Sequence, residues 1–449
     1  MNIVGRVAIG LVSAILLAAV LPGTASAAPA GEFTTFDLGP AGYSGNAIAA
    51  GPDGNMWFTN NANNSIGVIT PKGSVRYFPV PTDASQTSGS GLFDITAGPD
   101  GNMWFTGFYA NFVGKVTPNG VITLYPVPLA ESHPLGITAG VDGNLWFTLD
   151  FANGIGRITP AGVITLFPIP TAGVEGIVVS GTLVNTPYEI TAGPLDSLWF
   201  TMPAANLIGR MTMAGVVTTY PSGTVTPSST AATNVSLGSI TTGANGFLYF
   251  AESAAGKIGQ MTPDGVVTTY ALSSAAQPWA ITPGPADTLW FNEAGANALG
   301  NITVPGAKVA AALARYPNST ANSTPGALAT GADGNVWFVN VVSPSSGVFN
   351  LQIGTISTGY GRLLSAKVLG DPKVGSTLTC SKTEGNTWPG IKTRYHWLRN
   401  GQVIAGAQSR TFTPAKADKG DKIGCRVSVT YGVTLNQLGA NAKAVTIKP

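Results

Sequence analysis

A Trp-Phe dipeptide that returns at long intervals is the feature that most constrains how this chain can fold. Each of six tryptophans is followed by Phe, and Tyr249-Phe250 fills the one gap; the tryptophans are Trp57, Trp104, Trp146, Trp199, Trp290 and Trp337. The seven copies are 47, 42, 53, 50, 41 and 47 residues apart. A period of about 40 to 50 residues is typical of propellers and solenoids, in which each repeat is one structural unit.

Each repeat carries the same order of strand and turn signals. An apolar Ile-Thr segment precedes a Gly-rich turn, as at residues 98–102, and the Trp-Phe segment follows the turn. An Ile-Gly-x-Ile-Thr segment and an outer apolar segment complete the unit, as at residues 155–159 and 121–127 of two copies. With 58 Gly and 32 Pro and only 10% charged residues, the chain favours turns and strands over helices. We therefore predict four strands per unit, joined by hairpins whose Asp-Gly turns accept a positive φ.

The number of outer segments predicts how the array ends. No outer segment follows the seventh Ile-Gly segment at residues 353–357, but a matching segment precedes the first unit at residues 33–38. The N-terminal strand then completes the last blade, which closes a ring and leaves no open sheet edge. Residues 31–358 are therefore predicted to form an all-β, seven-bladed β-propeller closed by its N-terminal strand.

The first 27 residues predict export. Arg6 precedes an apolar run of 15 residues at 7–21, and Ala25-Ser26-Ala27 reads as a cleavage site with small residues. The run is shorter than the roughly 20 residues that a membrane-spanning helix needs. We expect a signal peptide over residues 1–27 and a secreted chain with no membrane span after cleavage.

The C-terminal segment, residues 362–449, reverses the charge of the propeller. It holds 14 Lys and Arg against 4 Asp and Glu, a net of +10, whereas residues 28–361 hold 8 against 17, a net of −9. Such a reversal marks a domain boundary. Cys380, Trp397 and Cys425 follow the order that is typical of an immunoglobulin-like β-sandwich. Because an exported chain meets oxidising conditions, a Cys380–Cys425 disulfide is favoured over two unpaired thiols.

The partners of the chain follow from its charge. The basic segment predicts contact with an anionic cell-wall polymer that holds the propeller at the cell surface; the alternative is a spacer kept dispersed by its lysines. The overall net charge of +2 gives no reason to expect nucleic acid binding. We expect a monomer.

The repeated Gly-Pro-Asp-Gly-Asn-x-Trp-Phe-Thr and Ile-Gly-x-Ile-Thr-Pro-x-Gly patterns resemble those of the virginiamycin B (streptogramin B) lyase family. The resemblance covers nearly all of residues 31–358 and does not include the C-terminal segment. It implies a propeller that opens a cyclic depsipeptide antibiotic by elimination. In that family a base removes a proton next to a carbonyl, the ester carboxylate leaves, and Mg²⁺ stabilises the developing charge.

The family's active site uses Glu and His residues on one face, with a Glu-Pro-His-Gly-Ile motif entering an inner strand. Here the positions just before the inner strands hold no His; they are Asn46, Phe93, Leu135, Tyr188, Leu237, Trp279 and Gly326. Glu131 and His133 keep a Glu-x-His pair, displaced by two residues, so His133 is the candidate base and Glu131 the group that orients it. Glu252 and Glu293 follow their aromatic-Phe strands and are the candidate Mg²⁺ ligands.

The loops from each outer strand to the next blade, and from each second strand to the third, share one face of a propeller. This face is predicted to gather acids and aromatic side chains, which suit a small organic or saccharide ligand. Those proposed for ligand binding are Phe93, Asp94, Tyr109, Asp150, Tyr188, Glu189 and Trp279, with Phe108 and Phe151 beside them. Ordinary solvated loops are the alternative interpretation. The acids of the repeated turns, such as Asp100 and Asp142, are attributed to hairpin formation.

Three functions compete at this point. The absence of the family histidines and the basic C-terminal segment favour a non-catalytic protein that binds a ligand or the cell surface. The repeats favour a Mg²⁺-dependent lyase of the streptogramin B type, a carbon–oxygen lyase. A lactonase-like hydrolase is the weakest, because the inward cluster of carboxylates and Asn that it needs is not evident.

Overall fold

The computed structural model describes residues 30–40, 47–81, 89–170, 178–179, 182–183, 186–223, 236–273, 275–285, 287–303, 313–345, 348–358, 365–383, 392–404, 406–430 and 437–448. The predicted signal peptide and Asn46 lie outside these residues. Within them, no helix has the length and apolar character that crossing a membrane requires.

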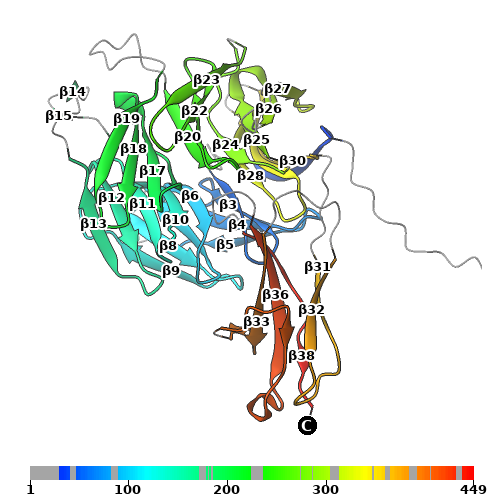
Figure 1. Cartoon of the computed structure of the whole chain (residues 1–449). Helices are drawn as coiled ribbons and strands as arrows, with labels where there is room; N and C mark the ends of the chain where they lie inside the picture. Colours follow the sequence, from blue (N-terminus) through cyan, green and yellow to red (C-terminus); the bar gives the residue numbers. More distant parts are fainter. Residues whose placement is uncertain are drawn as a thin grey trace, which may run out of the picture.

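Seven antiparallel sheets of four strands each make up the larger part of the molecule (Figure 1). The first three blades are β2(Ile48–Ala50), β3(Met56–Asn60), β4(Ser65–Ile69) and β5(Val75–Pro79); β6(Leu92–Ala97), β7(Met103–Gly107), β8(Phe112–Val116) and β9(Ile122–Pro126); and β10(Pro134–Ala139), β11(Leu145–Leu149), β12(Gly154–Ile158) and β13(Ile164–Pro168). The next three are β16(Ile190–Gly193), β17(Ser197–Met202), β18(Leu207–Thr212) and β19(Val217–Pro221); β20(Leu237–Thr242), β21(Leu248–Glu252), β22(Lys257–Met261) and β23(Val267–Ala271); and β24(Ile281–Pro283), β25(Thr288–Glu293), β26(Ala298–Thr303) and β27(Leu313–Pro317).

The seventh blade confirms the predicted closure of the ring. It consists of β28(Ser323–Thr330), β29(Val336–Ser345), β30(Val348–Ile356) and the N-terminal strand β1(Phe33–Pro40). Strand β1 pairs with β30 in antiparallel register, with Phe33 opposite Ile356. Phe36 stacks on Trp337 at 5.8 Å between ring centroids, so the closure also buries apolar surface. Two short strands, β14(Val178–Val179) and β15(Thr182–Leu183), lie between the third and fourth blades. The short helices η1(Pro203–Ala205) and η3(Ala294–Ala296) join the second and third strands of the fourth and sixth blades.

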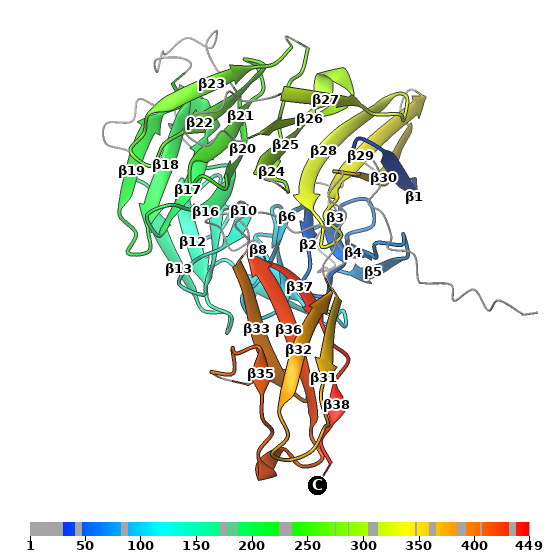
Figure 2. The same ribbon diagram turned by 45° about the vertical axis from the view of Figure 1, so that its right-hand side comes forward.

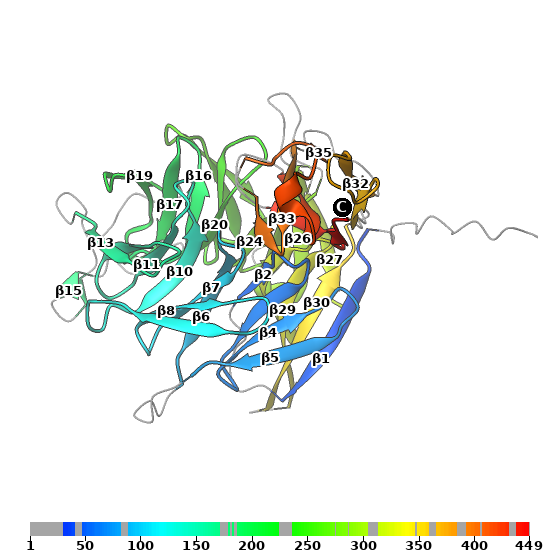
Figure 3. The ribbon, with the colours of Figure 1, turned by 90° about the horizontal axis from the view of Figure 1, so that it is seen from below.

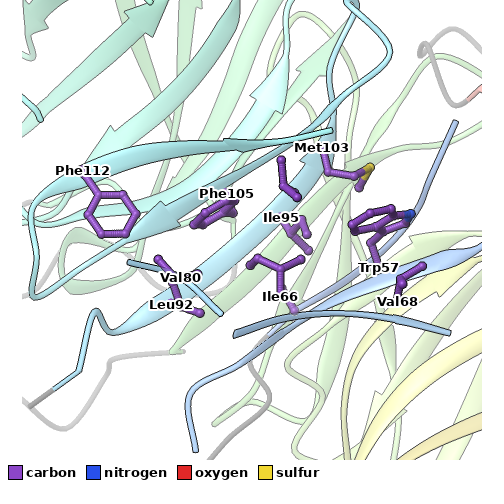
Figure 4. Close-up of a cluster of buried hydrophobic side chains, with 11 residues drawn as sticks. Trp57, Ile66, Val68, Val80, Leu92, Ile95, Met103, Phe105 and Phe112 are labelled. Atoms are coloured by element: carbon purple, nitrogen blue, oxygen red, sulfur yellow. The ribbon is translucent and has the colours of Figure 1, made fainter. Parts of the chain in front are cut away.

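The Trp-Phe dipeptides pack the blades against one another. Trp57 and Ile66 of the first blade share a core cluster with Ile95, Met103 and Phe105 of the second, as Figure 4 shows. Every Trp of the six dipeptides is almost fully buried. The dipeptides thus supply the apolar layer between neighbouring sheets, and burying such side chains stabilises the ring by roughly 2 kcal/mol each.

The acids of the repeated turns have a further role that the sequence did not suggest. In four blades the turn Asp accepts a hydrogen bond from the indole N–H of the buried Trp four residues later, at 3.0 to 3.1 Å; the acids are Asp53, Asp100, Asp142 and Asp333. Each of these carboxylates also holds the side-chain amide of the Asn that follows Gly in the turn. The turn and the core are therefore fixed by one side chain.

The C-terminal part forms two further sheets, drawn in orange to red in Figure 2. One contains β31(Ser365–Leu369), β32(Leu378–Thr383) and β35(Thr411–Phe412); the other contains β34(Gln402–Val403), β33(Lys392–Arg399), β36(Lys422–Thr430), β37(Gln437–Asn441) and β38(Val445–Thr446), with η4(Lys416–Asp418) between β35 and β36.

A disulfide between Cys380 on β32 and Cys425 on β36 joins the two C-terminal sheets, as predicted. Trp397 is fully buried in the same core cluster, and its ring stacks on Phe412 at 5.4 Å between centroids. This arrangement fits the predicted Cys…Trp…Cys sandwich, whose immunoglobulin-like character stays a prediction.

Candidate functional site

We define the loop face as the side of the ring that carries the loops from outer to inner strands and from second to third strands. The opposite side carries the Gly-rich turns. Arg426 of the C-terminal part lies at that opposite side, because a Cβ added to Gly101 in the turn after β6 would be 3.8 Å from its Nη1. Figure 3 views the molecule from the side of the C-terminal strands. The Arg426 side chain therefore lies next to the face of the Gly-rich turns and away from the loop face.

A threonine that follows each of four Trp-Phe dipeptides positions the residues of the loop face. The Thr106 hydroxyl accepts the N–H of Asp94 at 3.1 Å and donates to the carbonyl of Leu135 in the next blade. The Thr148 hydroxyl likewise donates to the carbonyl of Tyr188 at 2.7 Å, and Thr201 accepts the N–H of Glu189 at 3.2 Å. These bonds join neighbouring inner strands just where the candidate site residues begin.

Asp94 and Glu189 bring two carboxyls together at the centre of the ring. Asp94 accepts the N–H of Ile95 at 2.7 Å and, in the next blade, the N–H of Ile137 at 2.8 Å. Gly136 lies between the two acids, since a Cβ there would be 3.2 Å from Cα of Glu189. Burial raises the pKa of Asp94 to about 6, although both N–H donors oppose the shift. Burial and then the charge of Asp94 raise the pKa of Glu189 well above its ordinary value.

Three aromatic side chains from alternate blades meet beside these carboxyls. Phe93 and Tyr188 contact edge to face with 5.8 Å between centroids, and Tyr188 contacts Trp279 in the same way at 5.5 Å. Trp279 is 38% exposed, whereas Phe93 and Tyr188 are partly buried. Burial, followed by the negative charge of Glu189, raises the pKa of the Tyr188 phenol, while a side-chain hydrogen bond with Trp279 lowers it.

His133 lies in a second aromatic group on the same face. Its ring is 4.5 Å from that of Phe108 and 4.4 Å from that of Phe151 between centroids, and its Nδ1 is 3.0 Å from the carbonyl oxygen of Phe108. A carbonyl only accepts, so Nδ1 carries the proton, and in the neutral ring Nε2 is the basic nitrogen. Burial raises the pKa of Asp150, and a hydrogen bond with Thr186 and the charge of His133 oppose that shift.

Glu131 is not brought to the His133 ring in the described part of the chain. The Glu131 side chain is exposed, and both residues have a positive φ of 51°. Such backbone is uncommon for residues other than Gly and is found at functional sites and strained turns. The acid whose pKa responds to the charge of His133 is Asp150, and no contact between Glu131 and the His133 ring is found among the described residues, so the orienting role of Glu131 stays a prediction.

The two acids predicted to hold Mg²⁺ lie in different blades. Glu252 is buried at the end of β21, opposite Leu237. Glu293 is buried at the end of β25, and its carboxylate pairs with Arg315 on β27. Across the residues that the structure describes, no three His, Cys, Asp or Glu side chains gather where they could hold a metal ion. The described residues therefore do not fit a bound Mg²⁺.

Most of the residues predicted from sequence share the loop face, in two groups. The first is Phe93, Asp94, Tyr188, Glu189 and Trp279; the second is His133, Asp150, Phe108, Phe151 and Tyr109, the last being 64% exposed and in contact with Phe108. The negative charges of Asp94, Glu189 and Asp150 all act on Tyr188, so the groups adjoin. The repeated Thr and the Thr186 contact were missed, although the Thr after Trp-Phe recurs in the sequence.

A closed ring of seven four-stranded sheets, with aromatic and acidic side chains on one face, defines a seven-bladed β-propeller with a candidate ligand site. The chain belongs to the virginiamycin B lyase family, whose family model matches residues 23–183 and 178–345. A comparison with curated proteins gives no significant match.

Solved lyase structures are similar to this chain over the propeller. A streptogramin B lyase structure is 30% identical, with 73% of this chain and 98% of the other covered and a TM-score of 0.60. A virginiamycin B lyase from Staphylococcus aureus is 29% identical over 73% and 99% of the two chains, with a TM-score of 0.59. A catalytically inactive histidine-to-alanine form of the S. aureus enzyme with quinupristin is 28% identical over 72% and 99%, with a TM-score of 0.57.

Proposed function

We propose that this chain is a ligand-binding propeller that holds a small organic ligand on its loop face without the histidine chemistry of its lyase relatives. The observation that carries the proposal is the aromatic group of Phe93, Tyr188 and Trp279, in which Tyr188 contacts both other rings edge to face. All three residues lie at or just before the start of an inner strand. Aromatic surface with a few polar groups is the usual lining of a site for organic molecules. Trp279 is exposed enough to contact such a ligand.

The test is a titration of the mature chain with a streptogramin B, with Mg²⁺ or with EDTA. Tryptophan fluorescence reports binding, and chromatography with mass spectrometry reports any product. We expect the antibiotic, as a ring-containing organic probe, to bind and to be recovered unchanged under both conditions. A Mg²⁺-dependent change in retention at unchanged mass would contradict the proposal, because elimination opens the ring without altering its mass, whereas hydrolysis adds one water.

Elimination is the second candidate function, and the geometry of His133 favours it. Nδ1 donates to the Phe108 carbonyl, which leaves Nε2 as the base, and His133 lies close enough to Asp150 for its charge to act on that carboxyl. If the titration reveals turnover, His133→Gln should lower its rate by roughly 10²- to 10⁴-fold. Glu131→Gln should leave the rate unchanged, because Glu131 does not contact the ring. The opposite ranking of the two variants would restore Glu131 as the essential group.

We also propose that the chain is exported and that its C-terminal part contacts an anionic cell-wall polymer. The signal-like residues 1–27 and the Cys380–Cys425 disulfide support export. Exposed cations on the C-terminal part support polymer contact; they are Lys367, Lys373, Arg410, Lys416, Lys419, Lys422, Lys443 and Lys448. The polymer and the ligand would then occupy different parts of the molecule.

A further inference from the structure

In the part of the chain that the structure describes, no Lys or Arg acts on the carboxyls at the centre of the loop face. The charge of Asp94 acts on Glu189, and Asp94 itself is affected by burial and by its two backbone N–H donors. Among the described residues, the charge that acts on Asp150 is that of His133. The propeller as a whole is acidic, with 8 Lys and Arg against 17 Asp and Glu in residues 28–361. The local field at this centre therefore favours a positive group.

Glu189 differs from Asp94 in what its carboxyl contacts. Asp94 is held by two backbone N–H groups, from Ile95 and Ile137. The Glu189 carboxyl has no hydrogen-bond or ion-pair partner within the described residues, and its side chain is partly buried. Partial burial makes an unpaired charged carboxylate less favourable than a paired one. A cation placed beside Glu189 would supply the missing partner.

The aromatic rings beside the two acids suit a cation of a particular kind. The Tyr188 ring stands nearly at right angles to the rings of Phe93 and Trp279, with interplanar angles of 88° and 74°, so this group presents both ring faces and ring edges. Ring faces attract ammonium groups, and a Trp face does so most strongly. Rings do not replace the oxygen ligands that a hard metal ion needs, so the combination favours an organic ammonium group over Mg²⁺ or Ca²⁺.

We propose that Phe93, Tyr188 and Trp279, together with the carboxyls of Asp94 and Glu189, bind a ligand that carries an alkylated ammonium group. This inference rests on the proposed function, since it names the ligand class of the same site. The aromatic rings enclose the methyl groups of the cation, and the carboxyls provide its counter-charge. Both the ring contacts and the attraction to the carboxyls increase the affinity for a ligand of this class. A neutral ligand of the same shape is bound by apolar contact alone.

The experiment compares choline with 3,3-dimethyl-1-butanol, which has the same shape and no charge. Calorimetry on the mature full-length chain, at low salt and neutral pH, should show choline binding at least about tenfold more tightly than the alcohol. Glu189→Gln should weaken choline binding by roughly tenfold and leave the alcohol unaffected. Trp279→Ala should weaken both. Glu131→Gln is the matched control, because it removes an exposed acid of the loop face outside this group and should change neither.

The result that overturns the inference is equal binding of choline and the alcohol, no binding of choline, or no effect of Glu189→Gln. Failure of the proposed function is a separate result. If a streptogramin B or the alcohol binds and Trp279→Ala removes that binding, the loop face is a ligand site and only its preference for a cation is wrong. If Glu189→Gln and Glu131→Gln weaken choline binding equally, the attraction is a general effect of the acidic face and not of this site.

Discussion

At the scale of single residues, Asp94 and Glu189 show how neighbouring acids come to differ. Both lie at the residue before an inner-strand isoleucine, yet the Asp94 carboxyl bridges to the N–H of Ile137 in the next blade. Ser239 occupies the equivalent position in another blade, and its hydroxyl accepts the N–H of Ile281 at 2.8 Å. One function of this position is therefore to join adjacent blades. Among the described residues, the Glu189 carboxyl makes no such hydrogen bond to the next blade, so it is available to a ligand.

The raised pKa of Asp94 predicts how stability depends on pH. Its folded-state pKa is about 6, against 3.8 for the ordinary group, so its contribution is fully present below about pH 4 and is lost as pH rises through about 6. Glu189 and Tyr188 are the titratable groups that face it, and the Glu189 carboxyl, with its pKa also raised, adds an effect of the same sign. We expect the wild type to lose stability relative to Asp94→Asn between pH 4 and about 7.

Urea unfolding of both proteins across that range measures the effect. Asp264→Asn is the control, because the Asp264 carboxyl accepts a hydrogen bond from Thr262 and its pKa is lowered. Any contribution of Asp264 to stability therefore changes only below about pH 4, outside the tested range. A wild-type advantage over Asp94→Asn that is constant, or that grows with pH, would show that the Asp94 carboxyl is not held in an environment that disfavours its charge.

At the scale of elements, the glycine of the Ile-Gly-x-Ile strand is required because a larger side chain would clash with a neighbouring ring. Gly156 on β12 lies over the ring of Phe147 on β11, and a Cβ there would be 2.1 Å from Cζ of that ring. The same close approach recurs in the other six blades, at Gly67, Gly114, Gly209, Gly259, Gly300 and Gly354. The Phe of each Trp-Phe dipeptide and the Gly of the next strand therefore form one packing unit.

Gly156→Ala is expected to destabilise the propeller by about 1 to 3 kcal/mol, because the fully buried Phe147 ring has little room to move away from a new methyl group. Gly326→Ala is the matched control, since the nearest atom to its added Cβ would be 3.6 Å away. Chemical denaturation compares the two. Equal stability of the variants would mean that the ring moves at little cost and that the repeated glycine has another cause.

Local patterns were enough to predict the ring, but not the partners within the site. The spacing of Trp-Phe and the count of outer strands fixed the number of blades and the closure by β1, because both are repeated along the chain. The pairing of Asp94 with Glu189 depends on Gly136 of the intervening blade, which is a property of the packed ring. Glu131 is near His133 in sequence, but both residues have a positive φ, the Glu131 side chain is exposed, and the acid on which the charge of His133 acts is Asp150 of the next loop.

At the scale of the whole molecule, charge and position separate the two functions that we propose, ligand binding and polymer contact. The propeller carries a net of −9 and the C-terminal part a net of +10, each counted over its own residues, 28–361 and 362–449. Arg426 lies beside the Gly-rich turn after β6, on the side away from the loop face. A polymer bound to the outer lysines of the C-terminal part would therefore leave the loop face accessible to its ligand.

This separation predicts which charges control retention on purified cell walls that carry anionic polymers. Lys416→Gln with Lys419→Gln should make the chain elute at lower salt, because both side chains are exposed on the C-terminal part and exposed charges act within about 10 Å at 0.1 M salt. Lys72→Gln with Arg76→Gln removes two exposed cations from the propeller and should not change the elution. Ligand binding at the loop face should be the same in all three proteins. Equal loss of retention in both double variants would show that total charge, and not a surface of the C-terminal part, holds the chain to the wall.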